Sequence, residues 1–117
     1  MGRLTTHVLD TAQGQPAAGV RVTLHRHSGE EWFVIASFLT NGDGRSDEPL
    51  VEDDAFVAGT YELTFAIGEY FAAQDLDTPD PPFFDEAIVR FTVSDPAKHY
   101  HVPLLATPWS WTTYRGS

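Results

Sequence analysis

Apolar side chains recur at every second position in several short runs of this chain, and no other feature limits the possible folds as much. Arg3–Asp10 alternates in this way, and so do residues 20–26 and Ala87–Val93. A period of two places neighbouring side chains on opposite faces of an extended strand. Each run therefore predicts a β-strand with one face in a core and the other outside it.

Groups of turn-forming residues separate these runs, at residues 13–16, 28–30, 41–44 and 95–96. Glycine, asparagine and aspartate accept the backbone conformations that tight turns need. Further strands are predicted at residues 32–40, 61–67, 100–105 and 109–114. One short helix is predicted at residues 69–76, where helix-forming residues have a helical spacing. This order predicts an all-β fold, an antiparallel β-sandwich of seven to eight strands with one short helix.

Length and composition limit the organisation of the chain. Its 117 residues fall in the middle of the single-domain range, so one domain is expected over residues 1–117. The absence of cysteine excludes disulfides, thiolate catalysis and cysteine-bound zinc. No secretory signal is expected at the N-terminus, and every apolar stretch is far shorter than a membrane span. A cytoplasmic location and no membrane partner are the simplest expectation.

The charge balance is strongly acidic, with 17 Asp and Glu against 7 Lys and Arg and a net charge of −10. Such a surface repels a phosphate backbone, so nucleic-acid binding is not expected. A site for an anion or a polar heterocycle would need a local cluster of cations to reverse this field. The few basic residues are therefore more informative than the many acidic ones.

The histidines are the candidate chemical groups, because a neutral imidazole is available at physiological pH. His99 and His101 share a strand face opposite Tyr100, and His7 has the same relation to Val8. These three histidines should point away from the core. An i, i+2 pair such as His99 and His101 can bind zinc, but without a third ligand it is weak evidence for a metal site. Two others, at positions 25 and 27, are interpreted as solvent-exposed surface.

Several motifs in a fixed order resemble the transthyretin-related family over essentially the whole chain. They are Leu-Thr-Thr-His-Val-Leu-Asp at residues 4–10, Thr-Asn-Gly-Asp-Gly-Arg at 40–45, Phe-Phe-Asp-Glu at 83–86, and His-Tyr-His-Val-Pro-Leu-Leu at 99–105. The last four residues, Tyr114-Arg115-Gly116-Ser117, are similar to the tetrapeptide that marks the hydrolase branch of that family. The thyroid-hormone carrier branch lacks this terminus.

The resemblance implies one transthyretin-like domain and an enzymatic activity. The reaction would be hydrolysis of 5-hydroxyisourate to 2-oxo-4-hydroxy-4-carboxy-5-ureidoimidazoline, in urate degradation. It implies a small purine-derived substrate, no cofactor and no metal ion. It also implies a homo-oligomer, expected to be a homotetramer, in which facing sheets of neighbouring subunits enclose a channel.

The resemblance also implies the site. The catalytic residues would be His7, Arg45, His101 and Ser117, and the substrate-binding residues His7, Arg45, Tyr114, Arg115 and Gly116. His101 or His7 would be the general base that activates water, with His101 favoured, and Arg45 would donate to substrate carbonyls. Ser117 would add a hydroxyl and a terminal carboxylate. Tyr114 and Arg115 are expected to position that terminus rather than to react.

Two other functions remain open at the level of sequence. The first is a carrier that binds a small hydrophobic ligand in the same kind of channel. The second is an interaction module, a β-sandwich that presents strands or loops to a protein partner and holds zinc on His99 and His101.

Overall fold

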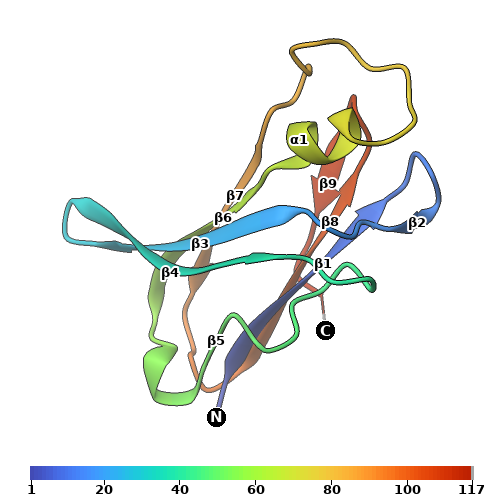
Figure 1. Cartoon of the computed structure of the whole chain (residues 1–117). Helices are drawn as coiled ribbons and strands as arrows, with labels where there is room; N and C mark the ends of the chain where they lie inside the picture. The colour runs from blue at the N-terminus through green and yellow to red at the C-terminus, as the bar shows by residue number, and fades with distance from the viewer. Residues whose placement is uncertain (117) are drawn as a thin grey trace.

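Two β-sheets packed face to face make up the computed structural model, which describes residues 1–116 (Figure 1). One sheet has the order β2-β1-β8-β9, with β5 also paired to β1, and the other has the order β4-β3-β6-β7. The strands are β1 Arg3–Asp10, β2 Gln15–Pro16, β3 Arg21–Ser28, β4 Glu31–Leu39, β5 Val51–Glu52, β6 Gly59–Phe65, β7 Ala87–Val93, β8 His99–Ala106 and β9 Trp111–Thr113. The helices are η1, a 3-10 turn at Asp53–Ala55, and α1, an α-helix at Ile67–Ala72.

The core lies between the two sheets and follows the alternation in the sequence. In β1, Leu4, Thr6 and Val8 are buried, whereas the residues between them are more exposed. Leu63 of β6 faces them with no exposed surface. Aliphatic and aromatic side chains fill such an interior at close packing, which is the main source of stability for a sandwich. The predicted β-sandwich with a single α-helix is confirmed for the described residues.

The pairing of β1 with β8 is parallel, although the other paired strands of both sheets are antiparallel. In its register Leu4 lies beside Tyr100 and Thr5 lies beside His101. Parallel neighbours cannot be joined by a tight turn, so a long crossover must separate them. Here the intervening chain builds the whole second sheet, and a strand near each end of the sequence meets in the middle of the first sheet.

The boundaries of α1 differ from the prediction. The alternation of residues 61–67 predicts a strand through Ile67, but β6 ends at Phe65 and Ile67 is the first residue of α1. The helix ends at Ala72, whereas the prediction placed it at residues 69–76. Ile67 is buried in the helix as it would be in a strand. Burial alone therefore could not distinguish the two conformations at this position.

Two other boundaries also differ. Gln15 and Pro16, predicted as part of a turn, pair with β1 as the short strand β2. The last strand, predicted at residues 109–114, is limited to Trp111–Thr113, because residues 107–110 form the turn that joins β8 to β9. A hydrogen bond from the Thr107 amide to the Ser110 carbonyl, 2.8 Å long, closes this turn.

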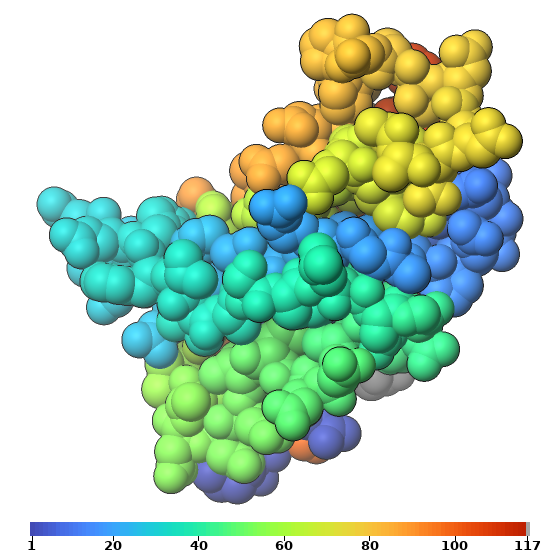
Figure 2. Space-filling model, viewed as in Figure 1, coloured from blue at the N-terminus to red at the C-terminus, as the bar shows by residue number. Residues whose placement is uncertain are grey.

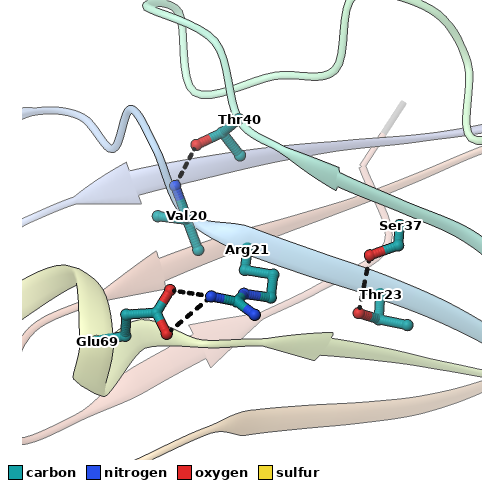
Figure 3. Close-up of polar contacts among 6 residues, drawn as sticks. All are labelled: Val20, Arg21, Thr23, Ser37, Thr40 and Glu69. Atoms are coloured by element: carbon teal, nitrogen blue, oxygen red, sulfur yellow. Dashed lines mark hydrogen bonds and ion pairs between the residues drawn. The ribbon is translucent and has the colours of Figure 1, made fainter.

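Helix α1 is fixed to both sheets by side-chain contacts. Arg21 of β3 donates to both carboxylate oxygens of Glu69, at 2.9 and 3.1 Å (Figure 3). On its other side, the Tyr70 hydroxyl donates to the buried carboxylate of Asp10 at the end of β1, at 2.8 Å. The helix therefore covers one end of the sandwich rather than lying free beside it.

Two segments project from the sandwich in the space-filling view. The β3–β4 hairpin extends to one side, and the proline-rich segment of residues 77–86 rises beyond α1 (Figure 2). The second segment lies beside the β8–β9 turn, where the ring centres of Phe83 and Trp109 are 6.0 Å apart. Among the described residues, no helix has the length and apolar character needed to cross a membrane.

Candidate active site

The outer face of the β1–β8 pair carries the two histidines that the alternation places outside the core. His7 and His101 are half-buried, whereas their chain neighbours Val8 and Val102 are buried on the inner face. Parallel pairing sets Thr5 directly beside His101 on this face. The outward orientation predicted from the sequence is therefore present, and the parallel register determines which residues meet there.

Thr5 fixes the ring of His101. Its hydroxyl oxygen lies 2.8 Å from Nδ1 of the imidazole, within hydrogen-bond distance. This bond occupies Nδ1 and leaves Nε2 as the ring nitrogen available to a bound molecule. A hydroxyl can donate or accept, so Thr5 can serve either neutral tautomer.

Arg45 reaches this face from a turn that Asn41 organises. The side-chain oxygen of Asn41 accepts hydrogen bonds from the amides of Asp43 and Arg45, at 2.9 and 3.1 Å. The Asn41 amide donates to the Arg45 carbonyl at 2.8 Å, and the Gly44 amide donates to the Asn41 carbonyl at 2.9 Å. Such side-chain-to-backbone bonds are the reason asparagine is favoured in tight turns.

Gly44 attaches the same turn to β1. Its carbonyl accepts a hydrogen bond from the Val8 amide at 2.8 Å. Its φ of +76° is in the left-handed region, and a Cβ atom there would collide with the Val8 carbonyl oxygen. Only glycine fits both the backbone conformation and the close approach. The turn therefore places Arg45 next to His7 at the edge of β1.

Electrostatics link the three side chains. The pKa of His101 is lowered from its ordinary value of 6.5, first by burial and then by the positive charges of Arg45 and His7. The pKa of His7 is also lowered, by burial and by Arg45, although the Asp43 carbonyl and carboxylate oppose this. Both imidazoles are therefore held in the neutral form that can accept a proton.

The C-terminal tail packs on His101. Gly116 forms an isolated antiparallel bridge with His101, and its amide donates to the His101 carbonyl at 2.7 Å. A Cβ atom on Gly116 would lie 2.7 Å from Cδ2 of the imidazole, closer than non-bonded carbon atoms normally approach. The absence of a side chain at Gly116 thus allows the tail to contact the edge of the ring.

Arg115 lies on the opposite side of the sheet from His101. Its guanidinium carbon is 4.1 Å from the centre of the Tyr100 ring, and its Nη2 donates to the His99 carbonyl at 3.3 Å. Tyr114 is exposed and borders the same inner groove.

The structure therefore brings His7, Arg45, His101 and Gly116 together, and directs Arg115 elsewhere. Ser117, predicted as a catalytic residue, lies outside the described residues.

Two hollows flank the strands of this face. A hollow of about 230 Å³ lies between β1 and residues 45–49, with Thr5 and Arg45 in its lining. A larger groove of about 320 Å³ opens between β7 and the end of the chain, with Tyr100 and Arg115 in its lining. The smaller hollow adjoins the histidines, whereas the larger groove is on the inner side of the sheet. We assign the candidate site to the smaller one because Arg45 and Thr5 line it, and Thr5 is the hydrogen-bond partner of His101.

The possible zinc pair finds no third ligand in the part of the chain that the structure describes. His99 is exposed and His101 is half-buried beside Thr5. No group of three or more His, Asp or Glu side chains among residues 1–116 is arranged to hold a metal ion.

Several residues of the site were not identified from the sequence. Thr5 was assigned only to a strand face, and Asn41 and Gly44 only to a turn. The signals were present, because Thr5 shares a face with His7 and the turn precedes Arg45 directly. The parallel register that joins Thr5 to His101 has no local signal.

Comparison with known proteins adds independent information. The model of the HIUase/Transthyretin family matches residues 4–116. A 5-hydroxyisourate hydrolase of Deinococcus radiodurans is 55% identical over 97% of this chain and 95% of its own length. The structure of Klebsiella pneumoniae 5-hydroxyisourate hydrolase is 35% identical, with full coverage of both chains and a TM-score of 0.81. The structure of (S)-allantoin synthase is 48% identical over 99% of this chain, with a TM-score of 0.93, and the chain spans 44% of its length.

Proposed function

The chain belongs to the HIUase/Transthyretin family, and we propose that His7, Arg45 and His101 form its active site for the hydrolysis of 5-hydroxyisourate. The chain catalyses the hydrolysis of 5-hydroxyisourate, the activity for which its full-length relatives are named. The proposed product is 2-oxo-4-hydroxy-4-carboxy-5-ureidoimidazoline, in urate degradation. One observation supports this assignment of the site above all others. Two half-buried histidines with lowered pKa values share one outer sheet face with Arg45, whose charge contributes to both shifts.

His101 is the proposed general base. Its Nδ1 is hydrogen-bonded to the Thr5 hydroxyl, so Nε2 faces the site and can take a proton from water. Burial and Arg45 keep the imidazole neutral near pH 7. His7 lies on the same face beside the Asp43 carbonyl, and we assign it to orienting the substrate or relaying the proton.

Arg45 is the proposed electrophilic group. Its guanidinium presents donors in a planar fork that matches the carbonyl oxygens of a flat heterocycle. When water attacks a ring amide carbonyl, negative charge develops on that oxygen, and a fixed cation nearby stabilises it. In a chain of net charge −10, this local cation also offsets repulsion of an anionic product.

The proposed reaction balances without a cofactor. His101 accepts one proton from water, and the resulting hydroxide adds to the amide carbonyl carbon of the six-membered ring. The carbon–nitrogen bond then breaks, and the leaving nitrogen receives the proton from His101. The ring opens to a carboxylic acid, which releases its proton to solvent and becomes a carboxylate, and His101 returns to its neutral state.

Assembly into a homotetramer is part of the proposal. The site is an open outer face in one chain, and active sites normally exclude bulk water. A second copy facing this sheet would enclose the histidines and Arg45 in a channel. A molar mass of one chain in light scattering at micromolar concentration, in an active sample, would contradict this. A cytoplasmic location is also proposed.

A carrier function is less well supported by the site. A pocket for a hydrophobic ligand is lined mainly by apolar side chains. Here the outer face carries His7, Arg45 and His101 instead. We propose no carrier or interaction-module function for this face.

Ultraviolet absorbance of freshly generated 5-hydroxyisourate tests the function directly. The decay should be much faster with protein than without it. A decay rate equal to the spontaneous one, with protein shown to be folded by circular dichroism, would exclude the proposed activity.

A further inference from the structure

Arg115 is the predicted substrate-binding residue whose observed position least fits contact with the substrate. Strand register explains this. Gly116 pairs with His101 and Thr113 pairs with Leu104, so Arg115 falls opposite Val102. Val102 faces the core, on the other side of the sheet from the histidines. The guanidinium therefore projects to the inner side, where it lies over Tyr100.

Four contacts of the tail form a continuous connection through the sheet. On the inner side, Arg115 stacks on Tyr100 at 4.1 Å and donates to the His99 carbonyl at 3.3 Å. In the plane of the sheet, the Gly116 amide donates to the His101 carbonyl at 2.7 Å. On the outer side, the Gly116 backbone runs so close to the His101 ring that an added Cβ atom would lie 2.7 Å from Cδ2.

The geometry points to Arg115 as a positioning residue that, by stacking on Tyr100, holds Gly116 against His101 and so fixes the proposed base in its working orientation. This inference rests on the proposed function, because it assigns a role within the same site. It separates the tail into an anchor, Arg115, and a contact, Gly116.

Tyr100 is suited to be the fixed half of the anchor. It is 5% exposed, and its hydroxyl accepts a hydrogen bond from the Asp95 amide at 3.1 Å. Its ring also makes an edge contact with Phe56, with ring centres 5.8 Å apart. A ring held by these two contacts presents a rigid aromatic face, which is what a stacked guanidinium needs.

His101 has few other restraints on its ring. Thr5 fixes Nδ1 by one hydrogen bond. A single hydrogen bond lets the imidazole ring tilt about the line of that bond. The Gly116 backbone next to Cδ2 limits this tilt. Loss of the tail contact should therefore disorder the base without removing it, and a misplaced base lowers the rate of the chemical step.

The test compares Arg115→Gln with Arg115→Lys and with Arg21→Gln. Glutamine keeps a donor but loses the cation, lysine keeps the cation, and Arg21→Gln removes the same charge from the other sheet. Arg115→Gln should lower kcat about two- to fivefold with little change in KM, as expected for loss of one exposed cation–π pair. Arg115→Lys should lie between this variant and the wild type, and Arg21→Gln should match the wild type.

Nuclear magnetic resonance of the histidine rings gives a readout without substrate. In Arg115→Gln the His101 ring signals should move toward those of a chain that ends at Tyr114. Tyr100→Phe keeps the aromatic face, so it should leave these signals in place even though it loses the bond to Asp95. Tyr100→Leu should reproduce the effect of Arg115→Gln. If Tyr100→Leu does not fold, the Arg115 variants still decide whether Arg115 positions His101.

Two outcomes would overturn the inference. A raised KM with unchanged kcat and unmoved His101 signals would mean that Arg115 contacts the substrate. Wild-type kinetics and wild-type signals in Arg115→Gln would mean that it has no role. Failure of the proposed function is a different result, because the wild-type protein itself would then not accelerate decay of 5-hydroxyisourate.

Discussion

Two His-x-His motifs lie in the two sheets of the molecule, and only one of them belongs to the candidate site. In β3, the ring of His27 packs at a tilt against Trp32 of the neighbouring strand, with ring centres 4.8 Å apart. In β8, His101 bonds to Thr5 and lies within the electrostatic influence of Arg45. The spacing of the histidines is the same in both strands. Their neighbours across the sheet therefore decide which motif can act as a base.

The surroundings of the two motifs differ in how charge is used. On the outer face of the β3 sheet, Arg90 pairs with Glu62 at 2.8 Å and lies 5.2 Å from the Trp32 ring centre. Its charge is thus satisfied within the face itself. On the outer face of the β8 sheet, Arg45 lowers the pKa of two histidines. An arginine that perturbs titratable groups in this way is a common property of functional sites.

Replacing one histidine from each motif should give the largest contrast. His101→Ala should lose about 10²–10⁴ in rate, the usual contribution of a general base. His27→Ala should keep wild-type turnover, since its ring only packs on Trp32. Initial rates with freshly generated 5-hydroxyisourate measure both. Near-full activity of His101→Ala would refute its role as base and transfer the assignment to His7.

Removing the cation of the site should change both rate and pH dependence. Because Arg45 lowers the pKa of His7 and His101, Arg45→Gln should raise both values. The wild-type rate should fall only below pH 6.5, as the base becomes protonated. This acidic limb of the pH–rate profile should move to higher pH in Arg45→Gln. Loss of charge stabilisation should lower kcat by about 10²-fold, as for loss of one oxyanion-stabilising donor.

An unshifted acidic limb in Arg45→Gln would show that this arginine does not influence the base. Arg90→Gln is the matched control, because it removes an arginine from the face that carries His27. Its pH profile should coincide with that of the wild type.

Glycines with positive φ in the two hairpin-like turns should differ in their tolerance of a side chain. Gly44→Ala combines a left-handed backbone with a collision against the Val8 carbonyl, so it should cost more than about 2 kcal/mol of unfolding free energy. Gly29→Ala has a similar φ of +66° but open space around it, and should cost about 1 kcal/mol. Urea denaturation measures both, and equal losses would contradict the assigned collision.

The smallest expected effect is on stability as a function of pH. The folded pKa values of His7 and His101 are below 6.5, so the folded state resists protonation more than the unfolded chain does. Stability should be complete above pH 6.5 and decrease as the pH falls through the lower, folded pKa values. In the double variant His7→Ala with His101→Ala this dependence should be weaker. Thermal unfolding at several pH values tests the difference.

Local patterns in the sequence predicted much of the fold. Alternation gave β1 and β7 with their observed bounds, and it placed His7 and His101 outside the core. It failed at Ile67, because an apolar residue at this position fits both a buried strand and the buried first turn of a helix. Gly44 and Asn41 indicated a turn, although not which strand the turn would contact.

Pairing between distant strands was beyond local patterns. The register of β1 against β8 brings Thr5 to His101, and nothing in either strand specifies it. The position of Arg115 depended on the same kind of information. Its side-chain direction follows from the bridge between Gly116 and His101, which fixes which residue faces inward. The reactive residues were thus easier to predict from the sequence than the contacts that position their side chains.

The crossover between β1 and β8 also sets when activity can arise during synthesis. Strand β1 leaves the ribosome well before β8 and the tail. The sheet of β3, β4, β6 and β7 can form through antiparallel neighbours before then. The β1–β8 pair must close a long loop, which slows folding. His7 and His101 therefore form one site only after β8 has paired with β1, and catalysis cannot begin before that pairing.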